Sequence, residues 1–527
     1  MWPGELMTFM PRVLSFYFSL DIGWLMMTKL SLQKGSPYRI TLSEIDTETR
    51  YRSILGRRRV EQLKEEVART LNRSCATKDV IQCVDKLQHL GIAYHFTEGI
   101  KSLLDRIADS TVAEDEGLFH AAQRFRVLRN YGYNVAPDLF HKFLNREAKF
   151  KDSLAADWRG LLSLHEASHY GTSHEGIMSH AMEFSKKHLK SPKSPFTPQQ
   201  LAQINHTLEL PRHMRMERFE AWRLIQESTH PKGNSSPLLE LASLDYNLVQ
   251  SQHQEELEEF TRWWKEHGLA HKLSFVRDRA QEFFLWTAGI FPQPSFSRSR
   301  IELTKSVGMC HLLDDLYDRY GSLEELTLFT DAIKRFAGPV LKICYLIVYN
   351  TTNEISYNVL VNSGKCVTSL FRKTYLRNGI TSAGTYVVSL LSFLLLGCPI
   401  SEESLRLVCS RDGLFSHSGR ILRLWNDLGT AKAEQQRGDV ASSIECYMQE
   451  RGLADDGDAR RHIRGLISTA WKDLNGDALA ASPLPFTVVN GCFNLARLSQ
   501  CFYRYGDDPK APSVEDIVKA LFLKPVK

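Results

Sequence analysis

Apolar residues recur every three or four positions along much of the chain, which is the spacing of one face of an α-helix. Within residues 60–71 the apolar positions on this face are Val60, Leu63, Val67 and Leu71. Residues 80–90 repeat the pattern. Runs of alternating apolar and polar residues, which predict β-strands, are scarce. The sequence therefore predicts an all-α protein.

A polar segment at residues 229–237 interrupts this helical pattern. It holds two prolines, a glycine and small polar residues in nine positions, a composition typical of a linker. A chain of 527 residues is also too long for a single hydrophobic core. We therefore expect an atypical N-terminal extension at residues 1–35, an N-terminal helical domain at residues 36–230 and a C-terminal domain at residues 231–527. All the candidate chemistry falls in the last of these.

Composition and charge limit which partners and which cellular compartment we expect for the protein. The net charge is only +5 and the longest basic block is Arg57 to Arg59, so no nucleic-acid partner is expected. No stretch reaches the ~18 apolar residues of a membrane span, so no stable membrane insertion is expected. The ten cysteines form no C-x-x-C pair, which indicates free thiols in a reducing compartment. Residues 1–35 lack the composition of a transit peptide, so a cytoplasmic location is expected, with the plastid as the alternative.

Three carboxylates stand within five residues of one predicted helix, at Asp314, Asp315 and Asp318. Asp314 and Asp318 lie one turn apart on the same face, and Asp315 lies about 100° further round. Carboxylate oxygens without imidazole or thiolate suit a hard cation such as Mg²⁺, whose coordination substrate phosphates complete. The alternative is an acidic helix face that only meets solvent.

A second set of oxygen ligands occurs further along the chain. Asn426, Thr430 and Glu434 stand at i, i+4 and i+8, so they project from one side of a helix. An amide oxygen, a hydroxyl and a carboxylate in line form a second site for a hard cation. Arg423, about one turn earlier, offers a guanidinium group to a phosphate. The alternative is a helix start followed by a polar surface.

A third stretch combines arginines with aromatic residues. Arg277 and Arg279 flank Asp278, and an aromatic run ending at Trp286 follows. Guanidinium groups suit an oxyanion leaving group, and aromatic faces suit a carbocation. Trp286 is the candidate for facing the cation, with a buried core tryptophan as the alternative.

In their order along the chain, these three motifs resemble those of plant class I terpene synthases, and the likeness extends from about Ala156 to the C-terminus. The resemblance implies a C-terminal class I terpene synthase fold and an N-terminal α-barrel-like domain. It also implies an enzyme that uses Mg²⁺, with Mn²⁺ as an alternative, to ionise a prenyl diphosphate. Tyr503 and Asp508 match positions near the mouth of the family's active site, with Tyr505 and Asp507 as neighbouring alternatives.

The N-terminal region departs from the family's cyclising monoterpene enzymes. Those enzymes often carry a tandem arginine followed by a tryptophan, but no tryptophan occurs between Trp24 and Trp158. In lacking this pairing, and in residues 284–290 and 511–522, the chain resembles the g subfamily, whose members mostly make acyclic alcohols. The resemblance thus implies linalool from geranyl diphosphate and/or nerolidol from farnesyl diphosphate. We expect the protein to act as a monomer. A cyclising mono- or sesquiterpene synthase is the alternative.

One spacing departs from the family pattern. Asp314 and Asn426 are 112 residues apart, whereas the resemblance implies roughly thirty residues more, or about 45 Å of helix. The apparent gap falls between Thr374 and Tyr375, where the family usually places a tryptophan-containing helix. Loss of a wall helix would leave apolar surface uncovered, so a catalytically impaired homologue is a further alternative.

Two other classes of protein fit the sequence less well. A prenyl-chain-elongating synthase would also bind Mg²⁺ through aspartates, but it normally carries two Asp-Asp-x-x-Asp motifs. A non-catalytic helical scaffold would show a repeat of roughly 30 to 50 residues, and we find none. Asp314→Ala should abolish turnover in a metal-dependent enzyme and leave the binding of a scaffold unchanged.

Overall fold

The structure is a computed structural model that describes most of the chain. The described residues are 47–73, 76–110, 116–191, 196–228, 236–268, 278–316, 413–437, 442–453, 455–480, 484–504 and 514–526, with short pieces at 273, 276, 320, 322, 324–325, 392–396, 401, 403–404 and 407. Within these ranges every regular element is a helix, apart from one isolated β-bridge between Leu144 and Phe150. The prediction of an all-α protein is confirmed. None of the described helices is long and apolar enough to cross a membrane.

The chain divides into two compact units. The N-terminal unit comprises residues 44–250, 469–482 and 520–527, and the C-terminal unit includes residues 251–468 and 483–519. Two long helices, α10 (Pro237–Glu266) and α21 (Asp456–Leu479), contribute residues to both units. The units thus follow packing rather than chain order, so the boundaries expected at residues 35 and 230 stay predictions.

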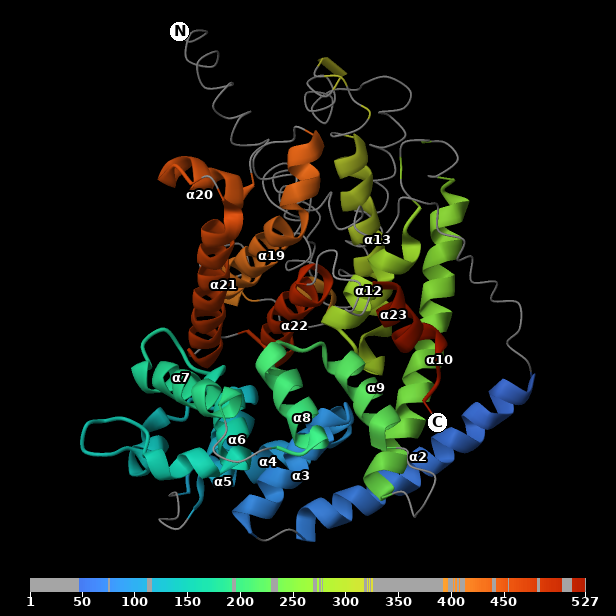
Figure 1. The fold of residues 1–527 in the computed structure, drawn as a ribbon. Helices are drawn as coiled ribbons and strands as arrows, with labels where there is room; N and C mark the ends of the chain where they lie inside the picture. Colours follow the sequence, from blue (N-terminus) through green and yellow to red (C-terminus); the bar gives the residue numbers. More distant parts are fainter. Residues whose placement is uncertain are drawn as a thin grey trace. The chain divides into compact units, whose positions relative to one another are not determined.

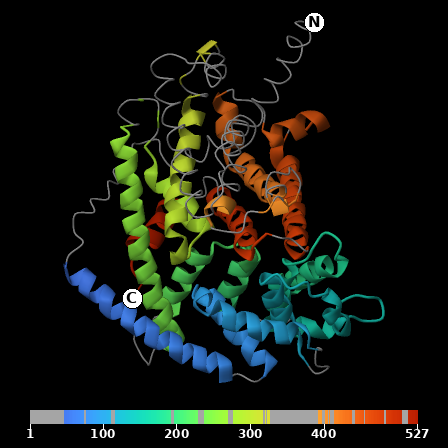
Figure 2. The same ribbon diagram turned by 180° about the vertical axis from the view of Figure 1, so that it is seen from behind.

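The N-terminal unit is built from one long helix, α2, of 27 residues and a series of shorter helices (Figure 1). They are α2 (Thr47–Arg73), α3 (Thr77–His89), η2 (Ala93–Phe96), α4 (Thr97–Ala108), α5 (Leu118–Asn130), η3 (Pro137–Phe143), η4 (Asp152–Ala156), α6 (Trp158–Ser168), α7 (Gly176–Lys190), α8 (Pro198–Glu209), η5 (Arg212–Met214) and α9 (Glu217–Ser228). In α4 the buried residues are Ile100, Leu103, Leu104 and Ile107, the three-and-four spacing of an amphipathic helix. Figure 2 shows α2 beside the first part of α10. The Arg59 guanidinium of α2 donates two hydrogen bonds to the Glu240 carboxylate of α10, at 2.7 and 2.9 Å.

Helix α5 departs from this simple pattern because it buries arginines. Arg124, Arg126 and Arg129 are each only 5% exposed. Arg126 forms two hydrogen bonds to the buried Asp85, at 2.8 and 2.7 Å, and Arg129 donates to the Val135 carbonyl. A buried charge is tolerated when it is paired in this way, so these arginines belong to the core.

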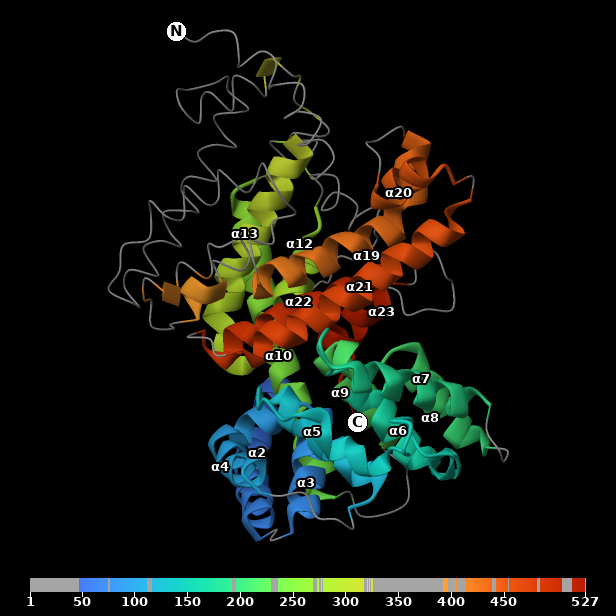
Figure 3. The same cartoon turned by 90° about the vertical axis from the view of Figure 1, so that its left-hand side faces the viewer.

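The C-terminal unit contains the helices that carry the candidate chemistry. They are α12 (Ala280–Ile290), η6 (Pro294–Phe296), α13 (Ser297–Asp315), α19 (Leu414–Arg437), α20 (Ser443–Arg451), α22 (Phe486–Tyr503) and α23 (Val514–Val518). A π-helical turn at Lys519–Leu523 follows α23 and, from Ala520 on, belongs to the N-terminal unit. Helix α22 packs against both α12 and α19, and α12 also packs against α13. Figure 3 shows α19 and α22 running alongside each other.

A buried ion pair fixes the position of α13 on α10. Arg300 has no exposed surface, and its guanidinium donates to both carboxylate oxygens of Glu256 at 2.8 and 2.7 Å. The same side chain donates to the Phe291 carbonyl at 2.6 Å, so it also holds the segment that follows α12. With its charge and its donors satisfied, the pair orients the helix that ends in the aspartate cluster.

Candidate active site

The structure describes the side chains of seven of the twelve predicted site residues, namely Arg279, Trp286, Asp315, Arg423, Asn426, Thr430 and Tyr503. Asp314 and Glu434 lie within α13 and α19, but their side chains are outside the described set. Arg277, Asp318 and Asp508 lie outside the described residues altogether. Among the described side chains, no three His, Cys, Asp or Glu groups converge.

Asn426 and Thr430 form the best-defined part of the site, on the buried side of α19. They are 1% and 2% exposed. The Thr430 hydroxyl donates its hydrogen to the backbone carbonyl of Asn426 at 2.7 Å, and a hydroxyl oxygen that donates can still act as an acceptor or a metal ligand. In the part of the chain that the structure describes, neither polar atom of the Asn426 side chain has a hydrogen-bond partner. Two buried oxygens that can accept on one helix side fit the ligand chemistry of Mg²⁺.

Asp315 is the last residue of α13 and is also buried, with 1% of its surface exposed. The aspartate at this position is therefore not part of a solvated helix face. One turn earlier on α13, the His311 ring makes an edge contact with Phe283 of α12, with ring centroids 4.4 Å apart. The hydroxyls of Thr287 and Thr304, 2.7 Å apart, further join α12 to α13.

Tyr503 brings three helices of the site together. Its side chain is 2% exposed, and burial raises the pKa of its hydroxyl above the usual range, so the hydroxyl stays protonated. The same pKa responds to the Asn426 side chain, which lowers it, to the Glu282 charge, which raises it, and to the Arg423 charge, which lowers it. The Tyr503 hydroxyl lies beside the Asn426 amide without meeting full hydrogen-bond geometry. Residues of α12, α19 and α22 thus share one electrostatic environment.

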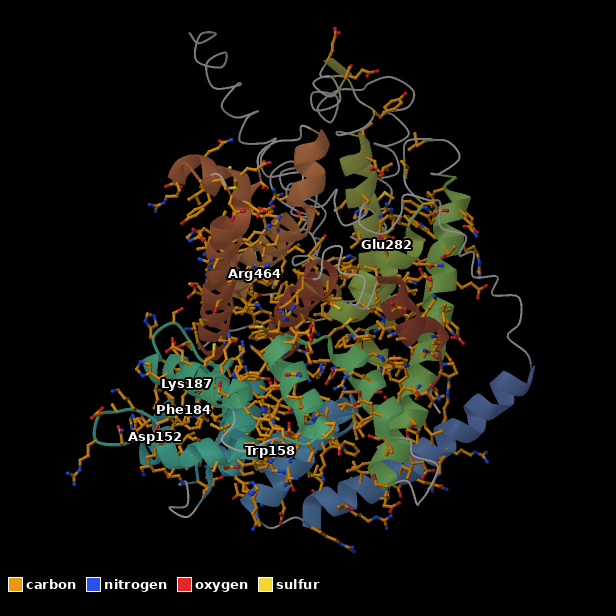
Figure 4. All side chains as sticks on the ribbon, viewed as in Figure 1. Asp152, Trp158, Phe184, Lys187, Glu282 and Arg464 are labelled. Atoms are coloured by element: carbon orange, nitrogen blue, oxygen red, sulfur yellow. The ribbon has the colours of Figure 1, made fainter. Side chains whose placement is uncertain are left out.

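Two predicted phosphate ligands are held by carboxylates. Arg279 precedes α12, and its Nη1 atom lies 3.3 Å from the Glu282 carboxylate in the first turn; Glu282 is labelled in Figure 4. On α19 the Arg423 Nε atom lies 2.9 Å from Oδ1 of Asp427. Sequence spacing alone does not reveal these pairings, because an i, i+3 or i, i+4 pair forms only when both side chains turn toward each other.

Trp286 is 3% exposed, and its ring stacks on Phe502 of α22. The ring centroids lie 4.6 Å apart and the planes differ by 7°, so this contact joins α12 to α22 and covers one face of the indole. A role for Trp286 in facing a cation stays a prediction. The sequence analysis missed Phe502, although its place next to Tyr503 was a signal.

Two family models match the chain. One is described as the terpene synthase N-terminal domain and matches residues 40–208. The other is described as the metal binding domain of the terpene synthase family and matches residues 265–374 and 363–473. The two segments of the second match overlap beside the gap predicted between Thr374 and Tyr375, a position outside the described residues.

Known relatives align along most of this chain. It is 42% identical to a chloroplastic monoterpene synthase of Cananga odorata, over 92% of this chain and 86% of the relative. It is 40% identical to a chloroplastic geraniol synthase of Ocimum basilicum (88% and 87% covered) and 39% identical to a chloroplastic R-linalool synthase of the same plant (89% and 87% covered).

The fold matches solved structures as well. Isoprene synthase from grey poplar leaves, in complex with three Mg²⁺ ions and dimethylallyl-S-thiolodiphosphate, has a TM-score of 0.82 at 31% identity, covering 90% of this chain and 98% of that one. Limonene synthase with 2-fluorolinalyl diphosphate has a TM-score of 0.83 at 29% identity, covering 90% and 95%.

The expected cytoplasmic location is wrong. All three of the relatives above are named as chloroplastic, which points to the plastid. The composition of residues 1–35 is a poor guide here, because a targeting segment is not constrained by packing and its signature is only statistical.

Proposed function

Because the chain belongs to the plant terpene synthase family, we propose that it converts a prenyl diphosphate into an acyclic tertiary alcohol. The proposed conversions are geranyl diphosphate to linalool and, for the longer substrate, farnesyl diphosphate to nerolidol. Enzymes of this family are Mg²⁺-dependent lyases that act on prenyl diphosphates, and this chain is such an enzyme. The proposal concerns its substrate length, its product and the residues that carry the reaction.

The observation that carries the metal assignment is the buried Asn426 amide, which has no hydrogen-bond partner within the described residues. An unpaired amide at this depth is costly unless a ligand satisfies it. We assign one side of the metal site to Asn426, Thr430 and Glu434 and the other to the aspartate cluster, at Asp314, Asp315 and Asp318. When bound, Mg²⁺ supplies positive charge to the diphosphate oxygens and so eases ionisation.

The remaining residues act on the diphosphate and on the carbon chain. Arg277, Arg279 and Arg423 would bind phosphate oxygens, since guanidinium groups stay charged at any working pH. As the C–O bond breaks, both electrons leave with the diphosphate and an allylic cation results. Trp286 would stabilise that cation through the indole face that Phe502 does not cover, while the buried helices around it limit the access of water. Tyr503 and Asp508 are assigned to the mouth of the site.

An acyclic tertiary alcohol requires one water to reach the cation before the chain folds back on itself. The water oxygen bonds to the tertiary allylic carbon, and the adduct then loses a proton. The likeness to the g subfamily supports this outcome, as does the R-linalool synthase among the relatives. The similarity of this chain to a monoterpene synthase, a geraniol synthase and a linalool synthase supports geranyl diphosphate, the ten-carbon substrate, in our proposal.

The test is an incubation of the purified protein with Mg²⁺ and, separately, geranyl and farnesyl diphosphate, with products identified by gas chromatography and mass spectrometry. We expect linalool from the first or nerolidol from the second, and loss of product when a chelator is added. Asn426→Ala should remove the activity while the protein stays folded. Geraniol or another primary alcohol as the main product would contradict the proposed site of water attack.

A cyclising enzyme is the second candidate, because limonene synthase matches the fold of this chain with nearly the same TM-score as isoprene synthase. Cyclic products in the incubation would establish it. If the folded protein makes no product from either substrate, the result would instead favour an impaired homologue, which lacks the segment predicted to be missing between residues 374 and 375.

A further inference from the structure

Three consecutive residues of α19 lie between Asn426 and Thr430, and each engages a different helix. The Asp427 carboxylate accepts a hydrogen bond from the Ser443 amide at the start of α20. The Leu428 carbonyl accepts one from Arg460 of α21 at 2.9 Å, and Gly429 lies against Tyr503 of α22. Figure 3 shows these helices grouped around α19. This turn of α19 is therefore fastened on three sides.

Asp427 differs from its two neighbours because it carries a charge. It is 1% exposed, and a carboxylate at this depth requires partners that compensate its charge and fill its lone pairs. The structure shows one partner of each kind. Oδ1 forms an ion pair with the Arg423 Nε atom at 2.9 Å, outside hydrogen-bond geometry, and Oδ2 accepts the Ser443 N–H at 3.1 Å.

The contact with α20 does not by itself explain a charged residue here. Helix α20 already has a complete capping box, in which Ser442 and Glu445 satisfy each other's backbone N–H groups. A neutral amide oxygen at position 427 would accept the Ser443 N–H equally well. The charge of Asp427 is matched to Arg423 instead.

We propose that Asp427 is a positioning residue that holds the Arg423 guanidinium in the orientation needed to bind diphosphate. This inference rests on the proposed function, in which Arg423 is a phosphate ligand. A guanidinium group is planar, so a carboxylate that attracts its Nε edge keeps that edge toward Asp427 and leaves the two terminal nitrogens on the opposite edge. A phosphate can then bind to Nη1 and Nη2 together, in a direction that Asp427 sets. Arg423 lies one helical turn before Asn426.

Two variants separate the two contacts of the Asp427 carboxylate. Asp427→Asn keeps an oxygen for the Ser443 N–H but removes the charge that orients Arg423. Ser443→Pro removes the Ser443 N–H and leaves the Arg423 pair intact. Proline suits this position, because Ser443 is the first residue of α20 and the preceding Ser442 has an extended backbone, with φ of −64° and ψ of 165°.

The probe is inorganic diphosphate in the presence of Mg²⁺, with affinity measured by calorimetry on the full chain. We expect Asp427→Asn to weaken binding on the order of tenfold, as supporting contacts around a ligand site typically do, and Ser443→Pro to leave it unchanged. Arg423→Gln should cause a similar loss, and the double variant should lose no more than Arg423→Gln alone. Unchanged affinity in Asp427→Asn, additive losses in the double variant, or an equal loss in Ser443→Pro would each overturn the proposal.

Two further measurements keep the result decisive. If Asp427→Asn fails to fold, as judged by circular dichroism, Arg423→Lys replaces it, because lysine keeps the charge beside Asp427 but has no planar fork; full affinity in that variant would overturn the proposal. Product formation is measured separately. A wild-type protein that binds Mg²⁺ and diphosphate but makes no alcohol would contradict the proposed product and leave the role of Asp427 standing, whereas no binding at all would overturn both.

Discussion

Gly429 on α19 lies directly against Tyr503 on α22. A Cβ atom at position 429 would stand 3.1 Å from the Tyr503 carbonyl oxygen and 3.3 Å from the Cβ and Cδ1 atoms of the same residue. The two helices come this close only because glycine has no side chain. The close approach brings the Tyr503 hydroxyl beside Asn426, so one small residue sets the distance between two predicted site residues.

We predict that Gly429→Ala lowers activity more than it lowers stability. Alanine favours a helix over glycine by about 1 kcal/mol, whereas overpacking against a backbone atom costs about 1–3 kcal/mol. The net loss of unfolding free energy should therefore be at most about 2 kcal/mol, but Tyr503 must shift away from Asn426. The check is thermal unfolding together with the rate of diphosphate release.

Gly465→Ala is the matched control for this substitution. Gly465 lies within α21, and a Cβ atom there would meet nothing within 4 Å. Because only the gain in helix propensity remains, this variant should be stabilised by up to about 1 kcal/mol with unchanged turnover. Equal effects of the two substitutions would contradict the importance of the Gly429 contact.

A second prediction compares two buried asparagines of the same unit. Asn426 makes no side-chain hydrogen bond within the described residues, whereas Asn494 donates to the Ile290 carbonyl at 2.9 Å and accepts from Arg497 at 2.7 Å. Asn494→Ala should therefore cost about 2 kcal/mol more than Asn426→Ala, yet only Asn426→Ala should abolish turnover. Similar melting temperatures for the two variants would show that Asn426 has a structural partner.

Much of the fold could be predicted from sequence because helix periodicity depends on local spacing. Val60, Leu63, Val67 and Leu71 are indeed buried in α2, and Val80, Val84 and Leu87 are buried in α3. Periodicity shows which face is buried but not what lies against it. The three arginines of α5 look like surface residues in the sequence, and only the structure brings Asp85 and backbone carbonyls to them.

The same limit applies to the candidate site. The i, i+4 spacing of Asn426 and Thr430 placed them on one side of a helix, and both are buried there. The pairing of Arg423 with Asp427 depends on side-chain rotamers, and the stacking of Trp286 on Phe502 joins residues more than two hundred positions apart. Neither relationship leaves a local pattern, so neither could be predicted from spacing.

A third prediction concerns the C-terminal residues, which α10 holds within the N-terminal unit. The Asn247 amide donates to the Val526 carbonyl and its oxygen accepts the Val526 N–H, both at 2.9 Å. Asn247→Ala should lower the unfolding free energy by about 1–3 kcal/mol and speed the removal of C-terminal residues by carboxypeptidase. Asn247→Asp keeps the acceptor and loses the donor, so its effect should be intermediate. Equal digestion of all three proteins would contradict this anchoring role.

The last prediction is a loss of stability in acid that originates at His165, which is 3% exposed. Burial, aided by the nearby Lys186 charge, lowers the pKa of His165 to about 4, from 6.5 in an exposed chain. Between pH 6.5 and 4 the unfolded chain binds a proton that the folded chain excludes, so stability is complete above pH 6.5 and falls by up to about 3 kcal/mol as the pH drops to 4. His165→Phe removes this group, and its melting temperature should fall less between pH 7 and pH 5 than that of the wild type. His141→Asn, at a largely exposed histidine, is the control and should follow the wild type. The same fall in all three proteins would assign the acid sensitivity to other groups.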